Sequence, residues 1–173
     1  MVSTKQIKLA FALSAILGLL LNSACFAADV DPTDEQRAAI SKNCTHILES
    51  LQQLQHVDSR TRTYLGTAYE SISSRFMTPL NLRLVKLGKP SVLLFDIQNN
   101  FTTTQSQFRE RYVEYMRSLE SLIATDCSAH PDDFYHNLLT VRQKRENLRL
   151  STKDLAKLAE EQYQAVIELK ENL

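Results

Sequence analysis

The chain is poor in the residues that turns and strands require. Its 173 residues include 3 glycines, 4 prolines and no tryptophan. Gly18 lies in an apolar N-terminal run, so Gly66 and Gly88 are the two glycines of the remaining sequence. An all-β fold needs turn residues about every ten positions. This composition leaves little room for the turns of an all-β fold and favours helices.

The sequence also lacks the short motifs that identify common enzyme and cofactor sites. It has no CxxCH for haem, no HExxH for zinc, no GxxxxGK[ST] for phosphate and no GxSxG nucleophile turn. Asp132 and Asp133 stand four and three residues before His136, a spacing that places side chains on one helix face. Without a further ligand nearby, this spacing predicts no metal site. We expect no enzyme, no cofactor and no metal.

Excess charge of one sign is missing as well. The chain carries 20 Lys and Arg and 20 Asp and Glu. Residues 1–27 contain two of these cations and none of the acids, so the sequence from Ala28 onward carries 18 positive and 20 negative side chains. Such a near-neutral balance argues against binding to nucleic acid through net charge.

The N-terminus has the pattern of a secretory signal peptide. Lys5 and Lys8 precede a 13-residue apolar run, residues 9–21, which only Ser14 and Gly18 interrupt. A charged start followed by an apolar run of this length is typical of exported proteins. A membrane-spanning helix needs roughly 20 apolar residues, which favours a cleaved signal over a permanent anchor.

The end of this segment predicts where it is cleaved. Small residues occupy positions −3 and −1, at Cys25 and Ala27, which suits cleavage before Ala28. A lipid anchor on Cys25 is the alternative, but it prefers an aliphatic residue where the chain has Asn22. We predict a signal peptide over residues 1–27, one domain over residues 28–173, and a secreted or otherwise extracytoplasmic location.

The first helix is predicted over residues 32–87, with a kink or break near Pro79. It would begin at Asp31 and Pro32, a capping residue and a favourable first helical residue. Apolar positions then recur in steps of four and three, with a polar interruption at Asp58 and Thr61. The stripe before the interruption comprises Ile40, Cys44, Ile47, Leu51 and Leu54.

Two further helices are predicted over residues 91–125 and 131–172. Gly88 and Pro90 mark the first turn, and Pro131 starts the last helix. The last helix has the most regular repeat, which Arg145 interrupts, and its length would be roughly 60 Å. Together the three segments predict an all-α fold, an elongated antiparallel three-helix bundle with coiled-coil-like packing. The predicted inward positions of the last helix are Phe134, Leu138, Val141, Arg145, Leu148, Thr152, Leu155, Ala159, Gln162, Val166, Leu169 and Leu173.

Two cysteines remain after cleavage, Cys44 and Cys127. An even pair in an exported chain favours a disulfide. If the first two helices form a hairpin about Gly88, both cysteines lie toward its open end. We therefore predict a Cys44–Cys127 disulfide.

The spacing of several residues resembles that of small secreted, single-disulfide helical proteins of candidate-phylum bacteria, which have no assigned function. The resemblance covers most of the chain after the signal peptide and implies export and a helical fold, with no catalytic residues. Pro79 departs from the pattern, in which the helix is uninterrupted. The residues that carry it are the early Cys44, Arg60 and Arg62 before Tyr64-Leu65, the Gly88 break before Leu93-Leu94, Thr125-Asp126-Cys127, Phe134 and the stretch from Arg142 to Arg149.

A basic stripe on the last helix is the candidate binding feature. Arg142, Arg145, Arg149 and Lys153 recur in steps of three or four, so they share one face of the helix. One interpretation is a surface for anionic lipid headgroups or cell-wall polymers. The other is a solvated face partly paired with acids of the second helix, such as Glu114 and Glu120.

These observations favour a non-enzymatic extracytoplasmic protein that acts as a structural or protein-binding module. Its partner would be an envelope or extracellular protein, and we expect no nucleic acid. The alternative function is an envelope chaperone or a protein that binds anionic polymers or membrane surfaces through the basic stripe. Binding with strong salt dependence would favour the alternative.

Overall fold

The computed structural model describes residues 31–171. The predicted signal peptide, its cleavage before Ala28 and the last predicted inward residue, Leu173, lie outside the described residues. The chain divides after Asp31, and the unit that starts at Pro32 is described below.

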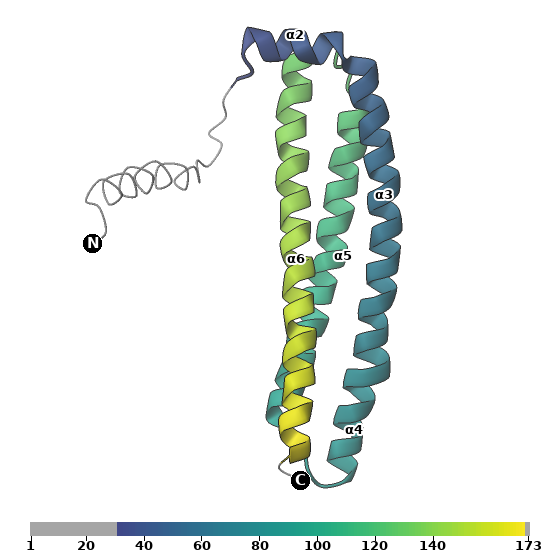
Figure 1. Ribbon diagram of the computed structural model, residues 1–173, viewed down its shortest axis with the longest axis vertical. Coiled ribbons are helices and arrows are strands. Elements are labelled where there is room, and N and C mark those ends of the chain that lie inside the picture. Colours follow the sequence, from purple (N-terminus) through teal and green to yellow (C-terminus); the bar gives the residue numbers. More distant parts are fainter. Residues whose placement is uncertain (1–30, 172–173) are drawn as a thin grey trace, which may run out of the picture. The chain divides into compact units, whose positions relative to one another are not determined.

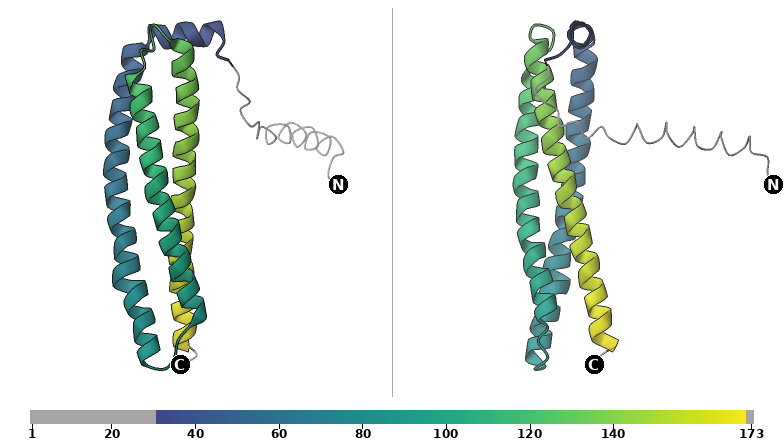
Figure 2. Two further views of the ribbon diagram at one scale, coloured as in Figure 1. Left: turned by 180° about the vertical axis from the view of Figure 1, so that it is seen from behind. Right: turned by 90° about the vertical axis from the view of Figure 1, so that its left-hand side faces the viewer.

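Over residues 31–171 the structure is helical and contains no strand, so the predicted all-α class is confirmed. The elements are α2 (Asp34–Lys42), α3 (Cys44–Ser71), the π-helical turn η1 (Ile72–Met77), α4 (Thr78–Lys86), α5 (Val92–Ala124) and α6 (Pro131–Glu171). In Figures 1 and 2, α3, η1 and α4 follow one another in one row, which we call the first row. The first row, α5 and α6 lie side by side, and α2 lies across one end. α5 and α6 pack together closely, whereas α3 approaches α5 at fewer points.

The first helix begins with a capping box. The Thr33 hydroxyl accepts a hydrogen bond from the Gln36 N–H at 3.2 Å, and the Gln36 side chain accepts one from the Thr33 N–H at 2.8 Å. These bonds satisfy two amides that a helix start leaves without a partner. The helix therefore begins at Asp34, two residues after the predicted start.

The prediction of a continuous helix up to Pro79 is wrong at Asn43. The side-chain amide and the backbone N–H of Asn43 both donate to the Ala39 carbonyl, at 2.8 and 3.1 Å. They cap the last turn of α2, and the chain changes direction before α3 begins at Cys44. An asparagine side chain can compete in this way for hydrogen bonds of the helical backbone. The apolar spacing continues from Ile40 to Cys44, so it gives no sign of the break.

Pro79 is preceded by a π turn and does not end the row of helices. A proline ring clashes with the carbonyl four residues earlier and has no N–H to donate. The turn just before it is widened, so that the Thr78 N–H donates to the Ser73 carbonyl, five residues back. Pro79 then occupies the first turn of α4, where a missing N–H is tolerated.

The core consists of three clusters along the helices. The first surrounds the disulfide and includes Tyr115 and Phe134. The second contains Tyr69, whose ring packs edge-on against two phenylalanines of α5, Phe101 and Phe108. The third lies near the α4–α5 turn. Of the predicted inward positions of α6 from Phe134 to Leu169, Arg145 is exposed and the others are buried or partly buried.

The predicted disulfide is confirmed. Cys44 and Cys127 are bonded, with their Cα atoms 5.5 Å apart and a sequence separation of 83. The bond joins the start of α3 to the segment between α5 and α6. At the opposite end, a short turn connects α4 to α5. The row formed by α3, η1 and α4 is therefore attached to α5 at both of its ends.

Candidate functional site

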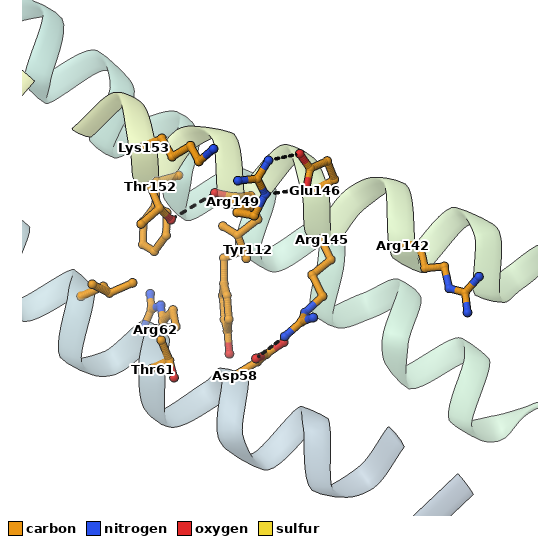
Figure 3. A pocket seen from close by; sticks show the side chains of 13 residues that line it. Asp58, Thr61, Arg62, Tyr112, Arg142, Arg145, Glu146, Arg149, Thr152 and Lys153 are labelled. Carbon is orange, nitrogen blue, oxygen red and sulfur yellow. Dashed lines mark hydrogen bonds and ion pairs between the residues drawn. The ribbon is translucent and has the colours of Figure 1, made fainter. Parts of the chain in front are cut away.

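The four predicted basic residues lie together at one groove. Arg142, Arg145, Arg149 and Lys153 of α6 line a pocket of about 480 Å³ together with Arg62 of α3. Figure 3 shows Arg62 on α3 and the basic residues along α6, with Arg142 beyond Arg145 at one end. We call this pocket the basic groove. The structure thus brings all the predicted candidates to one place and adds Arg62.

Apolar side chains from three helices line the basic groove between its cations. They are Leu65 of α3, Phe108 and Tyr112 of α5, and Leu148 of α6. The Arg62 guanidinium lies over the Tyr112 ring, 5.1 Å from its centroid, in a cation–π contact. A groove with apolar walls and cationic groups favours a ligand that combines apolar and acidic groups.

An ion pair crosses the groove and closes one part of it. Arg145 donates two hydrogen bonds to the Asp58 carboxylate of α3, at 2.9 and 3.1 Å. The hydroxyl of the buried Tyr115 donates to the same carboxylate at 2.6 Å. The two polar interruptions seen in the apolar repeats, Asp58 and Arg145, therefore contact each other. Hydrogen bonding to Asp58 raises the pKa of Arg145.

Arg149 is also paired, with an acid of its own helix. It donates to Glu146, with one distance of 2.6 Å, and this bond lowers the pKa of the Glu146 carboxyl. The predicted pairing of the stripe with Glu114 and Glu120 is wrong. Within residues 31–171, neither of these acids forms an ion pair with the basic stripe, whose carboxylate partners are Asp58 and Glu146.

Three cations of the groove keep their charge unpaired. In the part of the chain that the structure describes, Arg62, Arg142 and Lys153 have no carboxylate within 4.0 Å. The buried Nε of Arg62 has no hydrogen-bond partner there either. Five cations against two acids give the groove a net charge of +3. Such a site favours a negatively charged hydrogen-bond acceptor.

Sequence reasoning missed Arg62 as a member of this site. The signal that points to it is the polar interruption at Asp58 and Thr61, which lies between the parts of α3 that pack in the first and second core clusters. Arg62 follows Asp58 by four residues and so lies one turn further on the same face. Periodicity alone does not give the distance between α3 and α6, and this distance is what forms the groove.

Neither a metal site nor a membrane span is found in residues 31–171. No group of three or more His, Cys, Asp or Glu side chains is placed there to hold a metal ion. In the same residues, no helix is both long and apolar enough to cross a membrane.

Comparisons with protein-family models, with curated proteins and with solved structures found no match.

Proposed function

We propose that this protein is a non-enzymatic, extracytoplasmic protein-binding module, and that the basic groove docks an acidic, apolar segment of a partner protein. The observation that carries the proposal is the combination of apolar walls with three unpaired cations, Arg62, Arg142 and Lys153. A partner with carboxylates among apolar side chains would complete both sets of contacts.

The dimensions of the groove support a peptide segment as its occupant. Its basic wall runs over residues 142–153 of α6, which correspond to about 17 Å at the helical rise per residue. Three turns of a partner helix match this length. Arg145 and Arg149 are held by Asp58 and Glu146, so the stripe is not a continuous row of free charges. This pairing weighs against an extended anionic polymer bound along α6.

The architecture that would serve this function is an antiparallel three-helix bundle, open between α3 and α6. The close packing of α5 on α6 and the three core clusters support this arrangement. The Cys44–Cys127 disulfide supports an oxidising compartment, as export through the predicted signal peptide would provide. N-terminal sequencing of exported protein should then begin at Ala28, and a lipid-modified Cys25 would contradict this proposal.

The groove is tested with a pair of matched charge variants. Arg142→Gln/Lys153→Gln removes two unpaired groove cations. Arg117→Gln/Lys144→Gln removes one arginine and one lysine that line no part of the groove and form no ion pair within residues 31–171. We expect the groove variant to weaken binding of a fluorescent acidic amphipathic peptide by about tenfold or more, and the control to change it less than twofold.

A photocrosslinker locates the contact. Thr61 lines the groove, and the exposed Ser106 of α5 does not. Crosslinking to the acidic peptide from position 61, but not from position 106, supports the proposal. Equal loss of binding in both charge variants would indicate non-specific attraction instead, and binding of an anionic polysaccharide in place of the peptide would favour the polymer-binding alternative.

A further inference from the structure

Exposed apolar side chains concentrate at the α4–α5 turn. Eleven large apolar or aromatic residues of the described chain are exposed, and five of them lie within twelve residues of sequence. Their exposed fractions range from 49% to 75%. Such clustering on a helical protein marks an interaction surface, whereas single exposed apolar residues need no explanation. These five residues, which we call the apolar tip, are Leu82, Val85, Leu87, Val92 and Leu93.

The folded structure does not need these five side chains. The core of this end is made by the buried Leu84, Leu94 and Ile97, which pack with Ala165 of α6. The turn is set by the backbone, because Gly88 has a φ of 68° and the Lys89 N–H donates to the Leu84 carbonyl at 2.9 Å. The apolar tip is therefore surplus to the core and projects into solvent.

The charges around the apolar tip are mostly positive. Residues 71–95 contain four cations and no acid: Arg75, Arg83, Lys86 and Lys89. The last turn of α6 packs at the same end through Leu169, and brings Glu168, Lys170 and Glu171. Counting these three residues and the exposed Asp96, one turn beyond Val92 in α5, the end of the unit carries a net charge of +2.

We propose that the apolar tip and its lysines and arginines form a docking surface for an anionic lipid bilayer. Apolar side chains flanked by lysine and arginine are the composition that lies at the interface of anionic membranes, where the chains enter the acyl boundary and the cations meet lipid phosphates. In this arrangement Leu87 and Val92, on either side of the turn, enter the bilayer first. Lys86 and Lys89 reach the headgroups.

A second copy of the chain fits this surface less well. Two tips placed face to face would bring two sets of cations together, and like charges repel in an interface that excludes water. An anionic membrane presents the opposite charge and an apolar interior. Charge complementarity therefore selects the bilayer as the occupant.

The experiment measures co-sedimentation of the mature protein with vesicles. We expect binding to vesicles that contain phosphatidylglycerol and little binding to pure phosphatidylcholine. Lys86→Gln/Lys89→Gln should weaken binding by tenfold or more, since each interfacial cation is worth on the order of fivefold. Leu87→Ser/Val92→Ser should weaken it by a similar factor, because it removes apolar side chains that enter the acyl boundary. Val113→Ser/Leu150→Ser, which changes one exposed valine and one exposed leucine elsewhere, should bind as the unchanged protein does.

Insertion has its own readout because the chain contains no tryptophan. Val92→Trp provides a single fluorophore at the tip, and its emission should shift to the blue on anionic vesicles. Val113→Trp should show no shift. These variants replace exposed side chains, and unchanged helical circular dichroism verifies that they fold.

Three results would overturn the proposal. They are no binding of the unchanged protein to phosphatidylglycerol vesicles, binding that the tip variants leave intact, and a dimer in solution that the Leu87→Ser/Val92→Ser variant converts to a monomer. The groove variant Arg142→Gln/Lys153→Gln distinguishes this surface from the proposed peptide site. It should lose peptide binding and keep vesicle binding, and the tip variants should do the reverse.

Discussion

Asp58 of α3 pairs with Arg145 of α6, and both residues interrupt the apolar repeats of their helices. Its carboxylate accepts hydrogen bonds from Arg145 and from the buried Tyr115. A carboxylate that is mostly shielded from water needs such partners, and Tyr115 would otherwise have a buried hydroxyl with none. The three groups together fix how far α3 stands from α6, and so set the width of the basic groove.

Tyr115 gives the protein a predictable response to high pH. Burial, together with the adjacent Asp58 carboxylate, raises the pKa of Tyr115 above its ordinary value of 10.0. Above pH 10 the unfolded chain loses this proton while the folded chain keeps it, so the unfolded state binds fewer protons. The free energy of unfolding should then fall as the pH rises, by up to about 1.4 kcal/mol per pH unit from this group.

Urea unfolding at several pH values between 8 and 11.5 checks this expectation. Tyr115→Phe should cost about 1 kcal/mol at pH 8, where the hydrogen bond is lost. Its stability should decline less steeply above pH 10, so the gap to the unchanged protein should narrow. Tyr163→Phe, at an exposed position, should leave the alkaline decline unchanged. Parallel declines in all three proteins would contradict the assignment to Tyr115.

At the scale of helices, glycine and proline predicted the turns, whereas the apolar repeat did not show the break in the first helix. α5 begins and ends within one residue of the prediction and α6 begins at the predicted residue, because Gly88, Pro90 and Pro131 are strong local signals. At the break, the side chain and the backbone N–H of Asn43 both donate to the Ala39 carbonyl. The apolar residues on both sides of the break keep the same spacing. Spacing alone therefore cannot show that the chain turns between Ile40 and Cys44.

The two described glycines should respond to alanine with opposite signs. Gly88 has a φ of 68°, and an alanine there meets no atom within 4 Å, so its cost is that of the left-handed backbone alone. We expect Gly88→Ala to destabilise the protein by about 1 kcal/mol. Gly66 lies within α3 with the same free space, and Gly66→Ala should stabilise by roughly 0.5 to 1 kcal/mol.

Thermal unfolding of the two variants beside the unchanged protein gives the measurement. Each glycine serves as the control for the other, because the chemical change is the same and only the backbone conformation differs. A stabilising Gly88→Ala would show that the α4–α5 turn adopts another geometry. That result would also remove the basis for placing Leu87 and Val92 on either side of it.

At the scale of the described unit, both proposed surfaces include residues of the row formed by α3, η1 and α4. α3 forms one wall of the basic groove, and α4 carries part of the apolar tip. α3 packs on α5 more sparsely than α6 does, and the basic groove lies along this less closely packed side. The residues of the groove were largely predictable, because a helical face follows from spacing. The groove itself was not, since it depends on distances between helices and on the pairing of Asp58 with Arg145.

The disulfide should hold the loosely packed row in place. It closes a loop of 83 residues that contains α3, η1, α4 and α5. In the chain-entropy model such a bond stabilises the folded state by about 4 to 5 kcal/mol. We expect Cys44→Ser/Cys127→Ser to lower the free energy of unfolding in urea by an amount approaching this value, with part of the loss due to two polar groups in the first core cluster.

The same variant should lose order unevenly. Amide hydrogen exchange should rise most in the first turns of α3, which the disulfide fixes to the end of α5, and least in the α5–α6 pair, whose packing is independent of the bond. Because α3 supplies Arg62 and Asp58 to the basic groove, binding of the acidic peptide should weaken in this variant. Vesicle binding through the apolar tip, at the opposite end of the hairpin, should persist. A uniform rise in exchange across all helices would instead show that the unit opens as a whole, with no separate role for the first row.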